Sequence, residues 1–150
     1  MTNWPDGMAP NQAHVHARNE LTIAADPAAI WALLVNATAW PSFYPNARHV
    51  QVLDGSELAE GTRFRWTTFN IRATSTVKVF RPDHELAWEG VVLGTRAHHR
   101  WQLTQNPDGT TTVVTEETQR GPLPFLASRW VRAGLLRWHQ RWLEGLQSNA

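Results

Sequence analysis

The segment FLASRWVRAGLLRWHQRWLEGLQ, residues 125–147, decides the fold of this chain. When each residue advances by about 100° around a helix axis, the apolar and small side chains fall in one stripe roughly 160° wide. Arginine, glutamine and glutamate side chains lie outside this stripe, so the pattern predicts a long amphipathic helix with one face against a partner. The stripe consists of Ala127, Trp130, Val131, Gly134, Leu135, Trp138, Trp142 and Leu146.

The chain before this helix supplies the partner, because most of it is typical of β-strands. Apolar and polar residues alternate over several segments, and turn-forming sequences such as Asp54-Gly55 separate them. Two short helices are expected, one over 27–35 that Asp26-Pro27 begins and one over 38–44. The predicted strands cover residues 14–23, 47–53, 61–69, 71–80, 85–93, 95–105 and 110–119.

The order of these segments indicates an α+β fold. Strands and helices do not alternate, which argues against a doubly wound parallel sheet. We therefore predict a strongly curved, seven-stranded antiparallel sheet around the long C-terminal helix, with two short helices between the first two strands. Residues 1–12 contain two prolines and a glycine with little periodicity, so we expect a flexible N-terminal arm followed by one domain over 13–150.

The composition excludes several classes of function. Lys plus Arg number 14 and Asp plus Glu number 13, so the charge offers no footprint for nucleic acid. Cysteine is absent, which removes thiolate metal sites and cysteine nucleophiles. The first residues lack a basic and apolar leader, and no apolar run is long enough to cross a membrane, so a cytoplasmic protein is expected.

Several short motifs make the sequence similar to a known family. They are IAADPAAIW at 23–31, LAW at 86–88, HRWQL at 99–103, and GTTTV at 109–113 followed by Glu117 and Gly121. Together they resemble the polyketide cyclase/dehydrase branch of the START-like (SRPBCC) superfamily, over roughly residues 14–147. The resemblance implies a helix-grip fold with a deep apolar cavity between sheet and helix, and a hydrophobic small molecule as partner.

Strand alternation predicts which side chains face that cavity. Successive residues of a strand point to opposite faces, so the adjacent His98 and His99 cannot serve one site. With Trp101 and Leu103 inward, His99 faces the cavity and His98 is expected to be exposed on the other side. Nine tryptophans against one tyrosine suggest aromatic walls, although the same indoles could instead fill the space. The predicted ligand contacts are Trp40, Phe43, Phe64, Trp66, Ser75, Trp88, Gly90, Trp101, Thr115, Gln119, Trp130, Gly134 and Trp138.

His99 and Glu117 are the candidate catalytic pair, because both are predicted to point inward from adjacent strands. A carboxylate beside an imidazole raises its pKa, which would suit acid/base chemistry in an aldol cyclisation and dehydration. The alternative is a structural polar pair in an apolar core. Tyr44 is expected at the cavity entrance, either as a proton donor or as a lid residue.

No metal site and no cofactor are predicted, because no third histidine or carboxylate stands at ligand spacing. Leu136 and Leu143 lie off the main stripe and either pack on the short helices or form a homodimer contact. Three functions stay open. They are a polyketide cyclase/dehydratase-like lyase, a non-catalytic carrier or sensor of a hydrophobic ligand, and a protein-interaction module with a filled cavity.

Overall fold

The computed structural model describes residues 4–150. Most predicted elements are present, with boundaries shifted by one or two residues. In chain order, the elements are β1 (Val15–Ile23), α1 (Pro27–Val35), the 3₁₀ helix η1 (Ala37–Ser42), β2 (Ala47–Val52), β3 (Arg63–Thr68), β4 (Ile71–Arg81), β5 (Glu85–Val92), β6 (Thr95–Gln105), β7 (Thr111–Arg120), α2 (Pro122–Leu126) and α3 (Ser128–Asn149).

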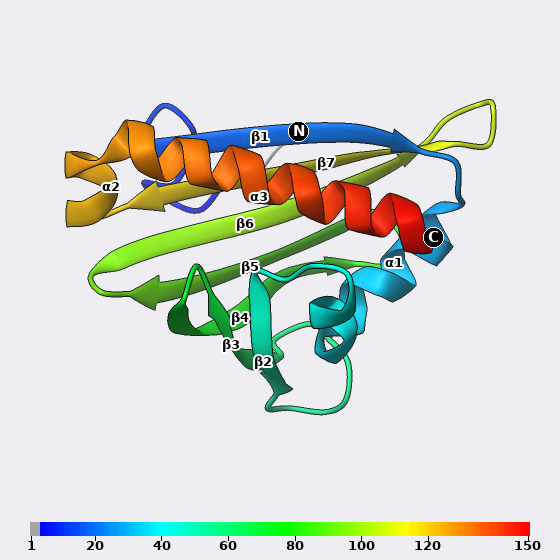
Figure 1. Cartoon of the computed structure of the whole chain (residues 1–150), viewed down its shortest axis with the longest axis horizontal. Coiled ribbons are helices and arrows are strands. Elements are labelled where there is room, and N and C mark those ends of the chain that lie inside the picture. Colours follow the sequence, from blue (N-terminus) through cyan, green and yellow to red (C-terminus); the bar gives the residue numbers. More distant parts are fainter. Residues whose placement is uncertain (1–3) are drawn as a thin grey trace.

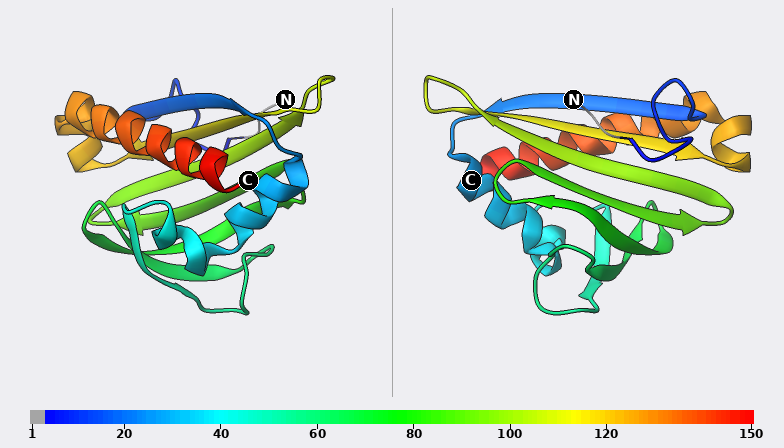
Figure 2. Two further views of the ribbon diagram at one scale, coloured as in Figure 1. Left: turned by 45° about the vertical axis from the view of Figure 1, so that its right-hand side comes forward. Right: turned by 180° about the vertical axis from the view of Figure 1, so that it is seen from behind.

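The seven strands form one antiparallel sheet in the order β1-β7-β6-β5-β4-β3-β2. Figure 1 shows α3 lying across the sheet, and the turned views show that the sheet curves around it (Figure 2). The pair α1 and η1 covers one end of this arrangement, and α2 lies at the other end beside the β5–β6 turn (Figure 1). This is the predicted α+β helix-grip architecture.

The predicted C-terminal helix over 125–147 is wrong at its start. Ala127 has φ −122° and ψ 37°, outside the helical range, so α2 ends before it and α3 begins after it. The face that α3 buries is also rotated from the predicted stripe. Trp130 is 74% exposed, whereas Leu143 is completely buried. Burial of Leu143 removes it from any dimer contact, and Leu136 packs against the small core cluster under β1.

Strand alternation is confirmed for most of the sheet, but a bulge breaks it in β4. Val77 pairs with Trp88 and Val79 pairs with Ala87, so one extra residue enters β4 between them. The bulge turns Val79 outward and Phe80 inward, where Phe80 packs edge-on against Trp31 with ring centroids 5.2 Å apart. Strict alternation along β4 would instead place Val79 inward together with Val77.

The outer face of the sheet is partly covered by residues 4–12. Met8 is fully buried, and the Trp4 ring meets His98 at 5.4 Å and the Arg100 guanidinium at 4.7 Å. His98 points outward as predicted, but it is 2% exposed, so the expectation of an exposed His98 is wrong. Flexibility of residues 1–12 stays a prediction, of which residues 1–3 lie outside the described part.

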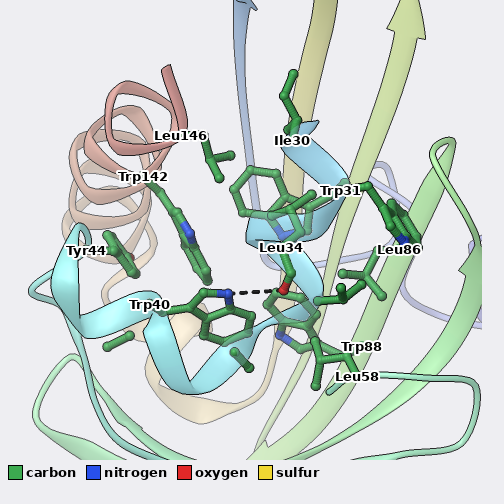
Figure 3. Close-up of a cluster of buried hydrophobic side chains, with 14 of the residues drawn as sticks. Ile30, Trp31, Leu34, Trp40, Tyr44, Leu58, Leu86, Trp88, Trp142 and Leu146 are labelled. Atoms are coloured by element: carbon green, nitrogen blue, oxygen red, sulfur yellow. Dashed lines mark hydrogen bonds between the residues drawn. The ribbon is translucent and has the colours of Figure 1, made fainter. Parts of the chain in front are cut away.

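The filled end of the molecule is a cluster of aromatic and aliphatic side chains from α1, η1, the sheet and α3 (Figure 3). Trp40 is fully buried at its centre, and its indole N–H donates a 3.1 Å hydrogen bond to the carbonyl of Leu34. Because this bond satisfies the buried N–H, the indole can occupy the core without leaving an unpaired donor. Among the described residues, no helix has the length and apolar character that crossing a membrane requires.

Candidate functional site

A cavity of about 390 Å³ lies between the concave face of the sheet and α3. Its walls are mostly apolar, with Trp66 and Trp88 on the sheet and Trp142 on the helix. The sequence left two possibilities, an open cavity or a space filled by indoles. Both occur, because the indoles fill the end under α1 and η1, and the space beside α2 stays open.

Small residues in two facing walls leave this space. Gly134 lies on α3, where an added Cβ would meet nothing closer than Phe69 Cε1 at 3.7 Å. Gly90 lies on β5, where a Cβ would come within 2.9 Å of the Thr74 carbonyl oxygen. Gly90 is therefore required by the close approach of β4, whereas Gly134 only keeps volume free. The predicted site residues that line the cavity are Tyr44, Trp66, Ser75, Trp88, Gly90, His99, Glu117, Gln119, Trp130 and Gly134.

The other predicted contacts lie behind the wall, which corrects their assignment. Trp40, Phe64 and Trp101 belong to the packed core, and Phe43 and Trp138 pack against that core from the side. For Phe64 and Trp101, alternation gives the face of the strand but not the depth at which the side chain ends. Thr115, the remaining predicted contact, is fully buried behind His99.

The buried titratable groups of the cavity lie together on β6, β7 and α3. His99 and Glu117 are directly opposite each other on β6 and β7, so the register that the sequence indicated is present. His99 Nδ1 lies 3.4 Å from Glu117 Oε1, and His99 Nε2 lies 2.6 Å from the hydroxyl oxygen of Thr115. The side-chain amide of Gln119 donates a 2.5 Å hydrogen bond to Glu117 Oε2. The imidazole and the carboxylate are thus each held on one side by a β7 residue.

His139 is a functional candidate that the sequence-based prediction missed. Its ring stacks on His99 with centroids 4.4 Å apart, and its Nε2 lies 3.4 Å from Glu117 Oε1. The expectation that no third ligand stands near the pair is therefore wrong, since His99, Glu117 and His139 offer donor atoms within 4.8 Å of one another. The signal was available in the helix period. His139 follows Leu135 by four residues and precedes Trp142 by three, which puts all three on one face.

Burial changes the acid/base character expected for His99. Desolvation lowers the pKa of His99 well below its ordinary value, and the neighbouring His139 and His98 lower it further. The predicted rise of this pKa by Glu117 is wrong, because complete burial of the imidazole outweighs a carboxylate that is 3.4 Å away. His99 is therefore a neutral imidazole at neutral pH.

Tyr44 lies deep in the cavity wall and not at its entrance. The side chain is 1% exposed and stacks on Trp142 with centroids 4.1 Å apart. Burial raises the pKa of Tyr44 well above its ordinary value, against a smaller lowering by the hydrogen bond that the Asn46 amide donates to its hydroxyl oxygen. Tyr44 stays protonated and can donate to an oxygen in the cavity, whereas the lid interpretation is wrong.

The open end of the cavity has an apolar rim. Leu93 in the β5–β6 turn, Leu123 in α2 and Trp130 at the start of α3 line the cavity and are 78%, 45% and 74% exposed. Phe125 and Leu126 of α2 are exposed nearby. A hydrophobic molecule that enters here meets an apolar surface before it reaches His99 and Glu117.

The sequence over residues 14–150 matches the profile of a family described as polyketide cyclase / dehydrase and lipid transport. The chain belongs to this family. No curated protein matches the chain.

Solved structures of the family's type share the fold. The hypothetical protein jhp0584 from Helicobacter pylori is 25% identical with a TM-score of 0.90, covering 99% of this chain and 95% of its own. A START superfamily protein from Mycobacterium smegmatis is 12% identical with a TM-score of 0.70, covering 89% of this chain and 94% of its own. The aromatase/cyclase ZhuI from a Streptomyces species is 15% identical with a TM-score of 0.75, covering 89% of this chain and 91% of its own.

Proposed function

We propose that the protein binds a flat, hydrophobic small molecule, aromatic or polyketide-like, in the cavity between the sheet and α3. The observation that carries the proposal is a mostly apolar space of about 390 Å³ in which a few buried polar side chains, among them His99 and Glu117, come together. Sites for small molecules have this size and this distribution of polar groups. The apolar walls hold the rings of the ligand, and Tyr44 and Gln119 offer hydrogen bonds to its oxygens.

Tryptophan fluorescence tests this binding, because four indoles line the cavity. Titration with a panel of polycyclic aromatic ligands should change the emission and saturate at one ligand per chain. Gly134→Leu places a side chain inside the cavity and should weaken binding at least about tenfold, whereas Ser148→Leu at the exposed end of the same helix should not. Absence of a response to every ligand would contradict the proposal and favour a protein-interaction module.

The second candidate function is cyclisation and dehydration of a β-keto substrate in the same cavity. The specific observation is the neutral, buried His99, whose contact with the Thr115 hydroxyl fixes the orientation of its ring. His99 can accept the α-proton, the resulting enolate carbon attacks a second carbonyl, and Tyr44 can protonate the new alkoxide. In the dehydration, the Tyr44 phenolate can accept a second α-proton while the protonated His99 gives its proton to the leaving hydroxyl, which departs as water. The Streptomyces protein ZhuI, which has the same fold, is named an aromatase/cyclase.

His99→Phe separates the two candidates. A catalyst loses turnover of a linear poly-β-ketone thioester, measured by mass spectrometry, and keeps its affinity for the aromatic ligand. A carrier that uses His99 as an anchor loses affinity or stability instead. Gly134→Leu is the matched comparison, since it lowers affinity without removing a polar group.

A further inference from the structure

Three donor atoms meet at the inner part of the cavity with the spacing of a metal site. His99 Nδ1 and His139 Nε2 are each 3.4 Å from Glu117 Oε1. This distance is longer than a charge-assisted hydrogen bond, which measures about 2.7 to 2.9 Å. It equals the separation of about 3.4 Å between two ligands that each lie about 2.1 Å from a tetrahedral ion.

The remaining polar atoms of His99 and Glu117 are already held. His99 Nε2 contacts the Thr115 hydroxyl at 2.6 Å, and Glu117 Oε2 accepts the 2.5 Å hydrogen bond from Gln119. Metal-binding histidines and carboxylates are usually fixed in this way by partners outside the metal's own ligands. The arrangement leaves Nδ1 and Oε1 as the donors available to an ion.

His139 completes the set from the helix. Its ring lies nearly parallel to that of His99, at 23° with centroids 4.4 Å apart, so one ring must turn before both nitrogens can point at one ion. Rotation of the His139 ring about its Cβ–Cγ bond achieves this. Within residues 4–150, the other ring nitrogen, Nδ1, is buried without a hydrogen-bond partner, so the rotation breaks no hydrogen bond at this atom.

The charge of the cluster favours a cation. The Glu117 side chain is 10% exposed, and its ion contacts among the described residues are the two histidines, without an arginine or lysine. A buried carboxylate is costly unless an opposite charge compensates it. A cation held between Glu117 and the two imidazoles would supply that charge.

We propose that His99, Glu117 and His139 form a mononuclear site for a divalent transition metal of the zinc class, with one coordination position open to the cavity. Two imidazoles and one carboxylate are a donor set that Zn²⁺ uses in catalytic sites with a fourth, exchangeable position. All three residues line the cavity, so an oxygen of the bound hydrophobic molecule can reach this position. The proposal does not depend on the proposed ligand or reaction.

Cobalt(II) tests the site directly, because its visible absorption reports tetrahedral coordination. The full chain is freed of metal with a chelator and titrated with Co²⁺ at neutral pH, and we expect saturation at one ion per chain and displacement by Zn²⁺. His139→Gln and Glu117→Gln should each weaken Co²⁺ binding at least about tenfold. His16→Gln is the matched control, since it breaks a comparable His16–Glu116 contact of 2.7 Å on the outer face, and it should leave the affinity unchanged.

Two results would overturn the proposal. One is the absence of stoichiometric binding to the wild-type chain, and the other is an affinity that His139→Gln does not change. If the variants do not fold, as judged by circular dichroism, histidine ring NMR of the wild-type chain decides. Zn²⁺ must shift the ring signals of His99 and His139 and leave the exposed His84 in place. Apolar-ligand binding measured by fluorescence is separate, so loss of the metal proposal leaves the proposed function intact.

Discussion

Replacing Gly134 with alanine should make the protein more stable. Glycine in a helix interior costs about 1 kcal/mol relative to alanine. Outside the helix's own backbone, the described atom nearest to an added Cβ here is Phe69 Cε1, at 3.7 Å. This is an ordinary van der Waals distance, so the full propensity gain of about 1 kcal/mol is expected. For a domain of this size it corresponds to a rise of about 2 to 4 °C in Tm.

Gly145 provides the matched substitution in the same helix. An added Cβ there would lie 2.7 Å from the Phe43 carbonyl oxygen and 2.9 Å from Phe43 Cδ2. Such overpacking costs about 1 to 3 kcal/mol, which outweighs the helix gain and leaves a net loss of about 1 kcal/mol. Gly145→Ala should therefore lower Tm.

Thermal unfolding followed by circular dichroism, and urea unfolding, measure whether each substitution raises or lowers the stability. A lower Tm for Gly134→Ala would mean that this face of α3 does not border open space, and the cavity itself would be refuted. Equal gains for both variants would show that the tight contact between α3 and the η1–β2 loop is absent. An unchanged urea m-value, which we expect for both variants, would show that neither changes the surface exposed on unfolding.

Two further predictions concern the only tyrosine and the N-terminal arm. Because burial raises the pKa of Tyr44, the folded protein keeps the phenol protonated above pH 10, where the unfolded chain ionises; stability should fall as pH rises above about 10. Absorbance at the tyrosinate band should then appear only together with unfolding, and a titration near pH 10 in the folded protein would contradict the burial of Tyr44. Trp4→Ala uncovers His98 and the buried Arg100, and it should cost about 1 to 2 kcal/mol in urea unfolding. An unchanged midpoint would show that the arm does not hold to the sheet in solution.

Arg100 shows why the outer face of the sheet was misjudged. Its guanidinium is buried by the arm and donates a 2.6 Å hydrogen bond to Glu85. A charged side chain on the outer face of a sheet would ordinarily face solvent, because burial of unpaired charge is costly. The predicted register is correct, since Arg100 does point away from the cavity. Residues 4–12, which are far from Arg100 in the sequence, cover that face of the sheet.

The sequence by itself determined the order of strands and helices, the inward direction of His99 and the position of Glu117 opposite it. These follow from a side-chain period of two and from short antiparallel connections, both local properties of the chain. The same reasoning could not place Val79 and Phe80, because the β4 bulge that exchanges their faces has no local sequence signal.

Tertiary structure alone decided which face of α3 meets the sheet. The apolar stripe predicted burial of Trp130 together with Leu135, Trp142 and Leu146. The helix is rotated so that these last three are buried with Leu143 and His139, and Trp130 is exposed. Rotation of a helix is set by the total packing against the sheet and the short helices, to which a polar residue also contributes once it finds Glu117. Because of this rotation, His139 lies beside His99. The predicted pair of His99 and Glu117 is therefore a cluster of three possible metal-donor residues.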